Sequence, residues 1–221
     1  MSPRPSYVLV ADLAASRVAT GRAGLSRTIE ATLRRAARDA NAWSAPPVTV
    51  KGLDEISAIV RRPGRVFDFA VALNLAVWPR RFRFALAAGE VDVAPSGRDA
   101  GAADGEAFHR AADALERAKA ADAPFVVAAP GLAGDRATLI EALARLHGVL
   151  LADVPAGATP VLRALRAAPD ATQARLARDL GMTQQAVSAA LGRARASDLD
   201  LAEAALRAAL TALPSPGTVA P

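Results

Sequence analysis

Residues 173–193 read QARLARDLGMTQQAVSAALGR, and this stretch decides the fold of the C-terminal part of the chain. A helix-turn-helix needs a small residue where its two helices cross, and Ala177 occupies that position. Four residues later it needs a turn residue that tolerates a positive φ, and Gly181 is there. It also needs an apolar residue six positions further along, on the second helix, and Val187 is there. This spacing predicts a helix-turn-helix whose core positions are Ala177, Gly181 and Val187.

The second helix of this unit should begin with a polar face. Thr183 can cap the helix through its hydroxyl, and Gln184, Gln185 and Ser188 follow it. A glutamine side chain can both donate and accept hydrogen bonds at an adenine edge in the major groove. The Thr-Gln-Gln opening resembles phage-repressor-type and sigma-like helix-turn-helix segments. The residues predicted to contact DNA are therefore Thr183, Gln184, Gln185, Ser188, Arg193 and Arg195.

Arg193 and Arg195 lie at the far end of the second helix, where contact with phosphates is sterically reasonable. The alternative is that each arginine only complements the negative end of the helix. The whole unit also has an alternative reading as an ordinary helical hairpin, with Gly181 as a plain C-cap and the glutamines solvated. The basic residues of this region, clustered within 160–196, are compatible with a surface that faces phosphates.

The chain before this unit alternates between strand and helix patterns. Phe82, Phe84 and Leu86 alternate with Arg81, Arg83 and Ala85, which is the clearest period-two strand. The order β-α-β-β-α-β-α-β begins with the six elements of a ferredoxin-like βαββαβ domain. We predict strands at 7–10, 48–50, 56–60, 82–86 and 125–129, with helices at 21–42, 65–77 and 107–120.

No strand pattern follows Gly131, so the sequence predicts an α+β protein with two domains. Residues 1–132 form the ferredoxin-like, cyclase- or palm-like domain, 133–213 the all-α helix-turn-helix domain, and 214–221 a disordered tail. The predicted helices of the second domain span 137–150, 160–166, 172–180, 183–195 and 198–213.

Two carboxylates of the first domain suggest a metal site. Asp12 ends the first strand, and Asp54 lies in the hairpin between the second and third strands. These strands lie at the centre of a ferredoxin-like sheet, so we expect the two side chains to be close. Palm-type polymerases and nucleotidyl cyclases hold Mg²⁺ in this way, and the metal then binds a nucleotide triphosphate.

Four segments follow one another along the chain: VADLAASR (10–17), LDEISAIV (53–60), FRFALAAGEV (82–91) and ADGEAFHRAADALERAK (103–119). In this order they resemble the SatD family, which is thought to be related to class III cyclase and GGDEF-type domains. This resemblance implies a cyclase-like domain followed by a helix-turn-helix. The chain departs from the family where Leu53 replaces a hairpin glycine, and where Ile56 and Ser57 replace Phe and Gln, so the site is read as degenerate. Its carboxylates could instead cap turns or pair with Arg17 and Lys51.

Composition excludes several classes of protein. The chain of 221 residues has no cysteine and two histidines, which excludes disulfide scaffolds, cysteine nucleophiles and Cys-ligated metal sites. Of the two histidines, we expect His147 to be structural. No apolar window is long enough to span a membrane, and the N-terminus shows no signal-peptide pattern, so we expect a cytoplasmic protein without a membrane partner.

These observations favour a DNA-binding protein, a transcription regulator that reads duplex DNA through its helix-turn-helix. A single unit of this kind buries little area, so a homodimer that spans two adjacent major grooves is expected. The first alternative is a Mg²⁺-dependent nucleotidyl cyclase-like or nucleotide-binding enzyme that the helix-turn-helix targets to DNA. The second alternative is a protein-binding adaptor without either activity.

Overall fold

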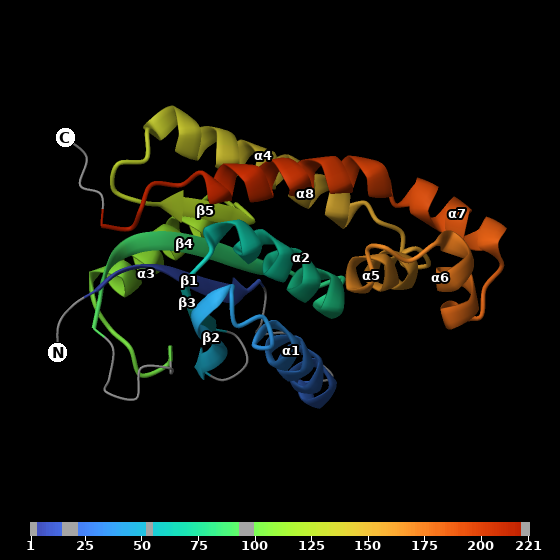
Figure 1. Ribbon diagram of the computed structural model, residues 1–221, viewed down its shortest axis with the longest axis horizontal. Coiled ribbons are helices and arrows are strands. Elements are labelled where there is room, and N and C mark those ends of the chain that lie inside the picture. Colours follow the sequence, from blue (N-terminus) through green and yellow to red (C-terminus); the bar gives the residue numbers. More distant parts are fainter. Residues whose placement is uncertain (1–3, 15–21, 52–54, 93–99, 218–221) are drawn as a thin grey trace.

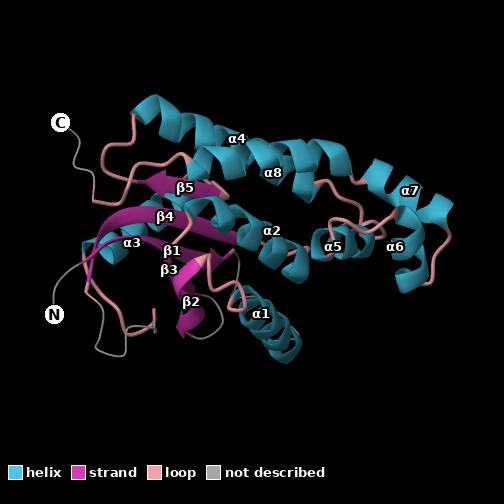
Figure 2. Cartoon of the chain, in the orientation of Figure 1, coloured by secondary structure: helices cyan, strands magenta, loops and turns pink. Residues whose placement is uncertain are grey.

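The computed structural model describes residues 4–14, 22–51, 55–92 and 100–217. The fold is of the α+β class, with a five-stranded sheet and eight α-helices in this part of the chain (Figures 1 and 2). The strand order is β2-β3-β1-β4-β5; β1 is antiparallel to β3 and β4, β2 is antiparallel to β3, and β5 is parallel to β4. The strands are β1 (Arg4–Leu13), β2 (Trp43–Lys51), β3 (Glu55–Val60), β4 (Phe82–Val91) and β5 (Phe125–Ala128).

Helices cover both faces of the sheet, because the alternating side chains of the strands are apolar on each side. Leu9 and Ala11 of β1 face the main core with α1 and α2, whereas Val8 faces α3. The short 3₁₀ turn Pro63–Arg65 precedes α2. The helices are α1 (Arg22–Ala36), α2 (Val66–Val77), α3 (Glu106–Ala120), α4 (Gly134–Ala152), α5 (Thr159–Ala167), α6 (Gln173–Leu180), α7 (Gln184–Arg193) and α8 (Ala196–Thr211).

The layer between α3 and the sheet is thin because it is built from small residues. Ala87 of β4 packs with Ala107 and Ala111 of α3. A Cβ atom added to Gly89 would lie 2.9 Å from the backbone nitrogen of Ala107, closer than real Cβ contacts. Glycine at this position therefore permits the close approach of α3 to β4.

The C-terminal helices do not form a separate layer. Helices α4 and α8 pack against each other, α4 packs on β5, and α8 packs on the turn before α2 (Figure 1). A Cβ atom on Gly64 would lie 2.0 Å from Oγ1 of Thr211, so this end of α8 touches the backbone of the turn. The main core is thus continuous across the predicted domain boundary after residue 132, while α5, α6 and α7 form the far end of the molecule.

A buried polar cluster joins three of these helices. His147 of α4 and Glu203 of α8 are both buried, and their Nε2 and Oε1 atoms lie 3.2 Å apart. Nε of Arg166, on α5, lies 2.9 Å from Oε2 of Glu203, and its NH1 lies 2.7 Å from Asp200. The carboxylate of Glu203 is thereby paired with a guanidinium, which a buried charge requires.

Several predicted boundaries differ from the observed ones, and two of these lie on either side of residues 37–42. The helix predicted over 21–42 ends at Ala36, and β2 begins at Trp43, five residues before its predicted start at 48. Pro46 and Pro47 lie within this strand, which is tolerated because β2 is an edge strand and its register shifts between Ala45 and Val48.

Residues 214–217 of the predicted tail lie in the described part of the chain, where the carbonyl of Pro214 accepts a hydrogen bond of 2.8 Å from the hydroxyl of Tyr7. The remainder of that tail, 218–221, lies outside the described residues. Within the described ranges, no helix has the length and apolarity needed to traverse a bilayer.

Candidate nucleic-acid interface

Two short helices and their caps build the candidate interface. The hydroxyl of Thr172 accepts a hydrogen bond of 3.2 Å from the backbone nitrogen of Arg175, so α6 begins with a side-chain cap. Leu176 and Ala177 point into the core, and the remaining residues of this helix are exposed or half-buried.

The turn between the helices depends on one glycine. Gly181 has φ 64° and ψ 33°, the left-handed conformation that ends α6. The backbone nitrogen of Met182 donates to the carbonyl of Ala177 at 2.8 Å, which closes the turn. Apart from its two chain neighbours, no described residue has an atom within 4 Å of a Cβ built on Gly181, so backbone conformation, and not space, favours glycine here.

The second helix, α7, repeats the capping pattern of the first. The backbone nitrogen of Ala186 donates to Oγ1 of Thr183 at 3.1 Å. Val187 and Ala190 are fully buried on the inner side of α7. Of the predicted core positions, Ala177 and Val187 are buried, and Gly181 is the residue that ends α6.

The predicted DNA-contacting residues lie on the outside of the unit. Thr183, Gln184, Gln185 and Ser188 are all exposed near the start of α7. Arg193, its last residue, is exposed and makes no ion pair within the described part of the chain. This arrangement offers hydrogen-bonding groups at one end of the helix and a free positive charge at the other.

Arg195 does not belong to α7, although the sequence predicts that the second helix extends to it. It follows the end of α7 and has φ 51°, a left-handed conformation that begins α8. Its Nε lies 3.0 Å from Oδ2 of Asp198, so its charge is partly neutralised. On α6, Arg175 lies 3.7 Å from Asp179, whereas Arg178 is exposed without an ion pair among the described residues.

Only one of the two predicted metal ligands lies in the described part of the chain. Asp12 pairs in register with Glu55 of β3, and its Oδ2 lies 3.6 Å from Nζ of Lys119 on α3. Burial raises the pKa of the Asp12 carboxyl in spite of this lysine, and the nearby charge of Glu55 raises the pKa further. Asp54 lies outside the described residues.

The contact with Lys119 differs from the predicted alternative partners, Arg17 and Lys51. Arg17 lies outside the described residues, and the side chain of Lys51 is not described. Among the residues that are described, no group of three or more His, Asp or Glu side chains is placed to hold a metal ion.

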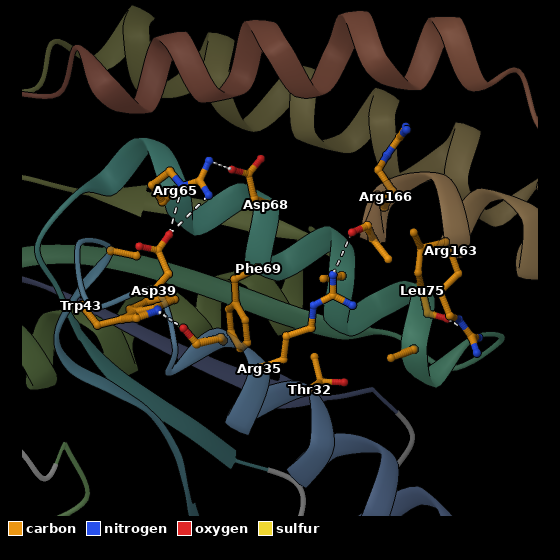
Figure 3. Close-up of a pocket in the computed structure, with 15 residues that line it drawn as sticks. Thr32, Arg35, Asp39, Trp43, Arg65, Asp68, Phe69, Leu75, Arg163 and Arg166 are labelled. Atoms are coloured by element: carbon orange, nitrogen blue, oxygen red, sulfur yellow. Dashed lines mark hydrogen bonds and ion pairs between the residues drawn. The ribbon is translucent and has the colours of Figure 1, made fainter. Parts of the chain in front are cut away.

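Sequence reasoning missed two features of the molecule. Lys119 approaches Asp12 from a helix far along the chain, and no local pattern indicates this contact. A cavity of about 330 Å³ between α1, α2 and α5 was also missed, because its walls come from three separate segments (Figure 3).

No protein-family model and no curated protein matches the chain. Among solved structures, it has a weak similarity to the crystal structure of a regulator of polyketide synthase expression from Bifidobacterium adolescentis. The two are 16% identical, with 96% of this chain and 85% of that chain covered and a TM-score of 0.25. A TM-score of this size supports no conclusion about fold or function.

Proposed function

We propose that the protein is a transcription regulator that binds duplex DNA through α6 and α7. The observation that carries this proposal is the pair of capped helices joined at Gly181, with Gln184 and Gln185 exposed at the start of α7. In the major groove, the two glutamines would contact base edges, and Arg193 would contact a phosphate. Arg195 would contribute less, because Asp198 already pairs with it.

A mobility-shift series over increasing salt tests DNA binding itself. Contacts between arginine and phosphate release counterions, so the affinity for duplex DNA should fall steeply as salt rises. An affinity that is absent at low salt, or that stays flat across the series, would exclude the proposal.

Substitutions in α7 then separate base contacts from phosphate contacts. Gln184→Ala and Gln185→Ala should each cost about 1–3 kcal/mol of discrimination between sequences selected from a random pool. Arg193→Ala should weaken all sequences alike and reduce the salt slope. Arg117→Ala, an exposed arginine in the last turn of α3 without an ion pair in the described chain, is the matched control and should bind as the wild type. Unchanged sequence preference in both glutamine variants would show that α7 is not the reading helix.

The proposed regulator acts as a homodimer, with α4 as the contact between copies. Leu139, Leu146 and Val149 of this helix are 69%, 63% and 56% exposed. Together with Ala142 they follow the spacing of a heptad seam, the pattern by which two helices pack along their length. The charged variant Leu146→Asp should convert a dimer into a monomer in sedimentation experiments, whereas a wild-type monomer would refute this part of the proposal.

The proposed classification of the first domain is ferredoxin-like, in keeping with the resemblance to the SatD family. The antiparallel order β2-β3-β1-β4, with α1 and α2 packed in one core, supports it. We also propose that the domain division lies after residue 132, because all the described strands precede it and only helices follow it.

Nucleotide processing is the second candidate function, and the position of Lys119 argues against it. Its ammonium group lies beside Asp12, where it supplies the positive charge that Mg²⁺ would otherwise bring. Mg²⁺ with GTP or ATP should therefore leave the melting temperature unchanged. A stabilisation that Asp12→Asn abolishes would restore the nucleotide-binding hypothesis.

A further inference from the structure

The cavity missed by sequence reasoning lies where the sheet domain meets the helices that lead to α6 and α7. Its walls come from α1, the start of β2, α2 and α5, and its volume is about 330 Å³ (Figure 3). This volume is at the lower end of the range for small-molecule sites. It is suited to a ligand of modest size, such as a single ring with one substituent.

The lining of the cavity is apolar on one side. Trp43 and Phe69 both line it, and their rings pack edge to face with centroids 5.5 Å apart. Leu75 and several alanines extend this surface. Because both rings are held by their mutual packing, they form a preformed wall for an apolar group.

Four arginines also line the cavity, and they differ in how their charges are balanced. Arg65 lies 3.3 Å from Asp39 and 3.0 Å from Asp68, so two carboxylates neutralise it. Arg166 pairs with Glu203 and Asp200 in the buried polar cluster. These two guanidinium groups need no further anion.

Among the residues that the structure describes, Arg35 and Arg163 have only carbonyl partners. NH2 of Arg35 donates to the carbonyl of Ala167 at 3.2 Å, and NH2 of Arg163 donates to the carbonyl of Leu75 at 2.7 Å. Within the described chain neither guanidinium has a carboxylate within ion-pair distance, and each retains further N–H donors. Two unneutralised positive charges, one on α1 and one on α5, therefore border the same cavity.

From this combination we infer that the cavity binds a small organic carboxylate with an apolar body. The carboxylate would be held between Arg35 and Arg163, since guanidinium groups bind carboxylates through paired, charge-assisted hydrogen bonds. The apolar body would lie against Trp43 and Phe69.

The position of the cavity gives such a ligand an effect on α6 and α7. Arg35 joins α1 to the last residue of α5, and Arg163 joins α5 to the last turn of α2. Helix α5 packs against both α6 and α7. A carboxylate bound between the two arginines therefore changes how α5, and with it the proposed DNA-binding unit, is held on the sheet domain. This coupling rests on the proposed function, whereas ligand binding does not.

Binding can be measured without DNA, by thermal shift and by tryptophan fluorescence of the full chain. The probes are benzoate, phenylacetate and hexanoate, with neutral benzamide and inorganic phosphate as comparisons. At least one carboxylate should bind, and benzamide and phosphate should bind about tenfold more weakly or worse. The inference is overturned if no carboxylate binds at millimolar concentration, or if benzamide or phosphate binds as well.

Variants then locate the site. Arg35→Met and Arg163→Met remove a charge and keep an unbranched side chain, and each should weaken the carboxylate about tenfold. Arg35→Lys, which keeps the charge but loses the fork of donors, should lie between. Arg136→Met on α4 is the control and should bind as the wild type, and circular dichroism checks that every variant is folded. Unchanged affinity in both the Arg35 and the Arg163 variants refutes the site.

A mobility-shift assay with and without the bound carboxylate reads the coupling separately. We expect the carboxylate to change DNA affinity in the wild type and not in Arg35→Met. Carboxylate binding without any DNA binding would reject the proposed function and leave the site intact. DNA binding that the bound carboxylate does not alter would reject the coupling.

Discussion

Two glycines of the candidate interface allow a sharp test of the turn between α6 and α7. Gly181 is in the left-handed conformation with φ 64°, whereas Gly192 lies in the last turn of α7. A Cβ atom at either position would have no neighbour within 4 Å. The substitutions Gly181→Ala and Gly192→Ala are therefore matched in space and differ in backbone conformation.

The expected effects have opposite signs. A left-handed conformation costs an alanine about 1–2 kcal/mol, and the lower entropy of its unfolded chain returns about 0.4–1 kcal/mol. Gly181→Ala should therefore lower the free energy of unfolding by about 1 kcal/mol. Gly192→Ala should raise it by about 0.5–1 kcal/mol, because alanine favours a helix. For a chain of this size, 1 kcal/mol shifts the melting temperature by about 2–4 °C.

Thermal and urea denaturation followed by circular dichroism measure both changes. Gly181→Asn serves as a control, since asparagine adopts the left-handed conformation more readily and should lose less stability than alanine. Shifts of the same sign in Gly181→Ala and Gly192→Ala would show that the turn does not hold residue 181 in the left-handed region.

Three further predictions concern the sheet. Burial raises the pKa of Tyr7 to about 12, so between pH 10 and 12 this phenol is ionised in the unfolded chain and still protonated in the folded chain. The free energy of unfolding, measured with urea, should therefore fall by up to about 1.4 kcal/mol per pH unit in this range. Tyr7→Phe should lack this loss. Gly89→Ala should lower the free energy of unfolding by about 1–3 kcal/mol, because its Cβ meets the backbone of α3. Gly24→Ala, within α1 and with open space around it, should raise that free energy by up to about 1 kcal/mol; equal melting temperatures would contradict the close packing. Burial raises the pKa of Asp12, so the ionised carboxylate opposes folding at neutral pH, and this effect is removed as the pH falls through that pKa. Asp12→Asn should therefore keep the wild-type free energy of unfolding at neutral pH. A decrease above about 1 kcal/mol in urea denaturation would contradict this.

Local chemistry explains which elements could be predicted from the sequence. Thr183 and Gly181 act within a few residues of their own positions, so the ends of α6 and α7 follow from residue type. The alternation of Phe82, Phe84 and Leu86 likewise indicates β4 without reference to any other segment.

The remaining features depend on contacts between distant segments. Pro46 and Pro47 break a local strand pattern, and only the edge position of β2 allows the strand to continue through them. Asp12 suggests a metal ligand when it is read alone, and its ion pair with Lys119 exists only once α3 covers the sheet. The side chains around the cavity come from three segments, 32–43, 65–76 and 163–167, so no local motif could reveal it.

Helix α8 gives the molecule a mechanical connection between its two ends. Its 16 residues form a rod about 24 Å long. Thr211 fixes one end against the backbone at Gly64, and Arg195 joins the other end directly to α7. A tilt of about 5° at the anchored end therefore moves the end at α7 by about 2 Å, which is a large displacement for side chains that must match the spacing of base edges. Helix α8 can therefore pass a displacement from the turn before α2 to the proposed DNA-binding unit.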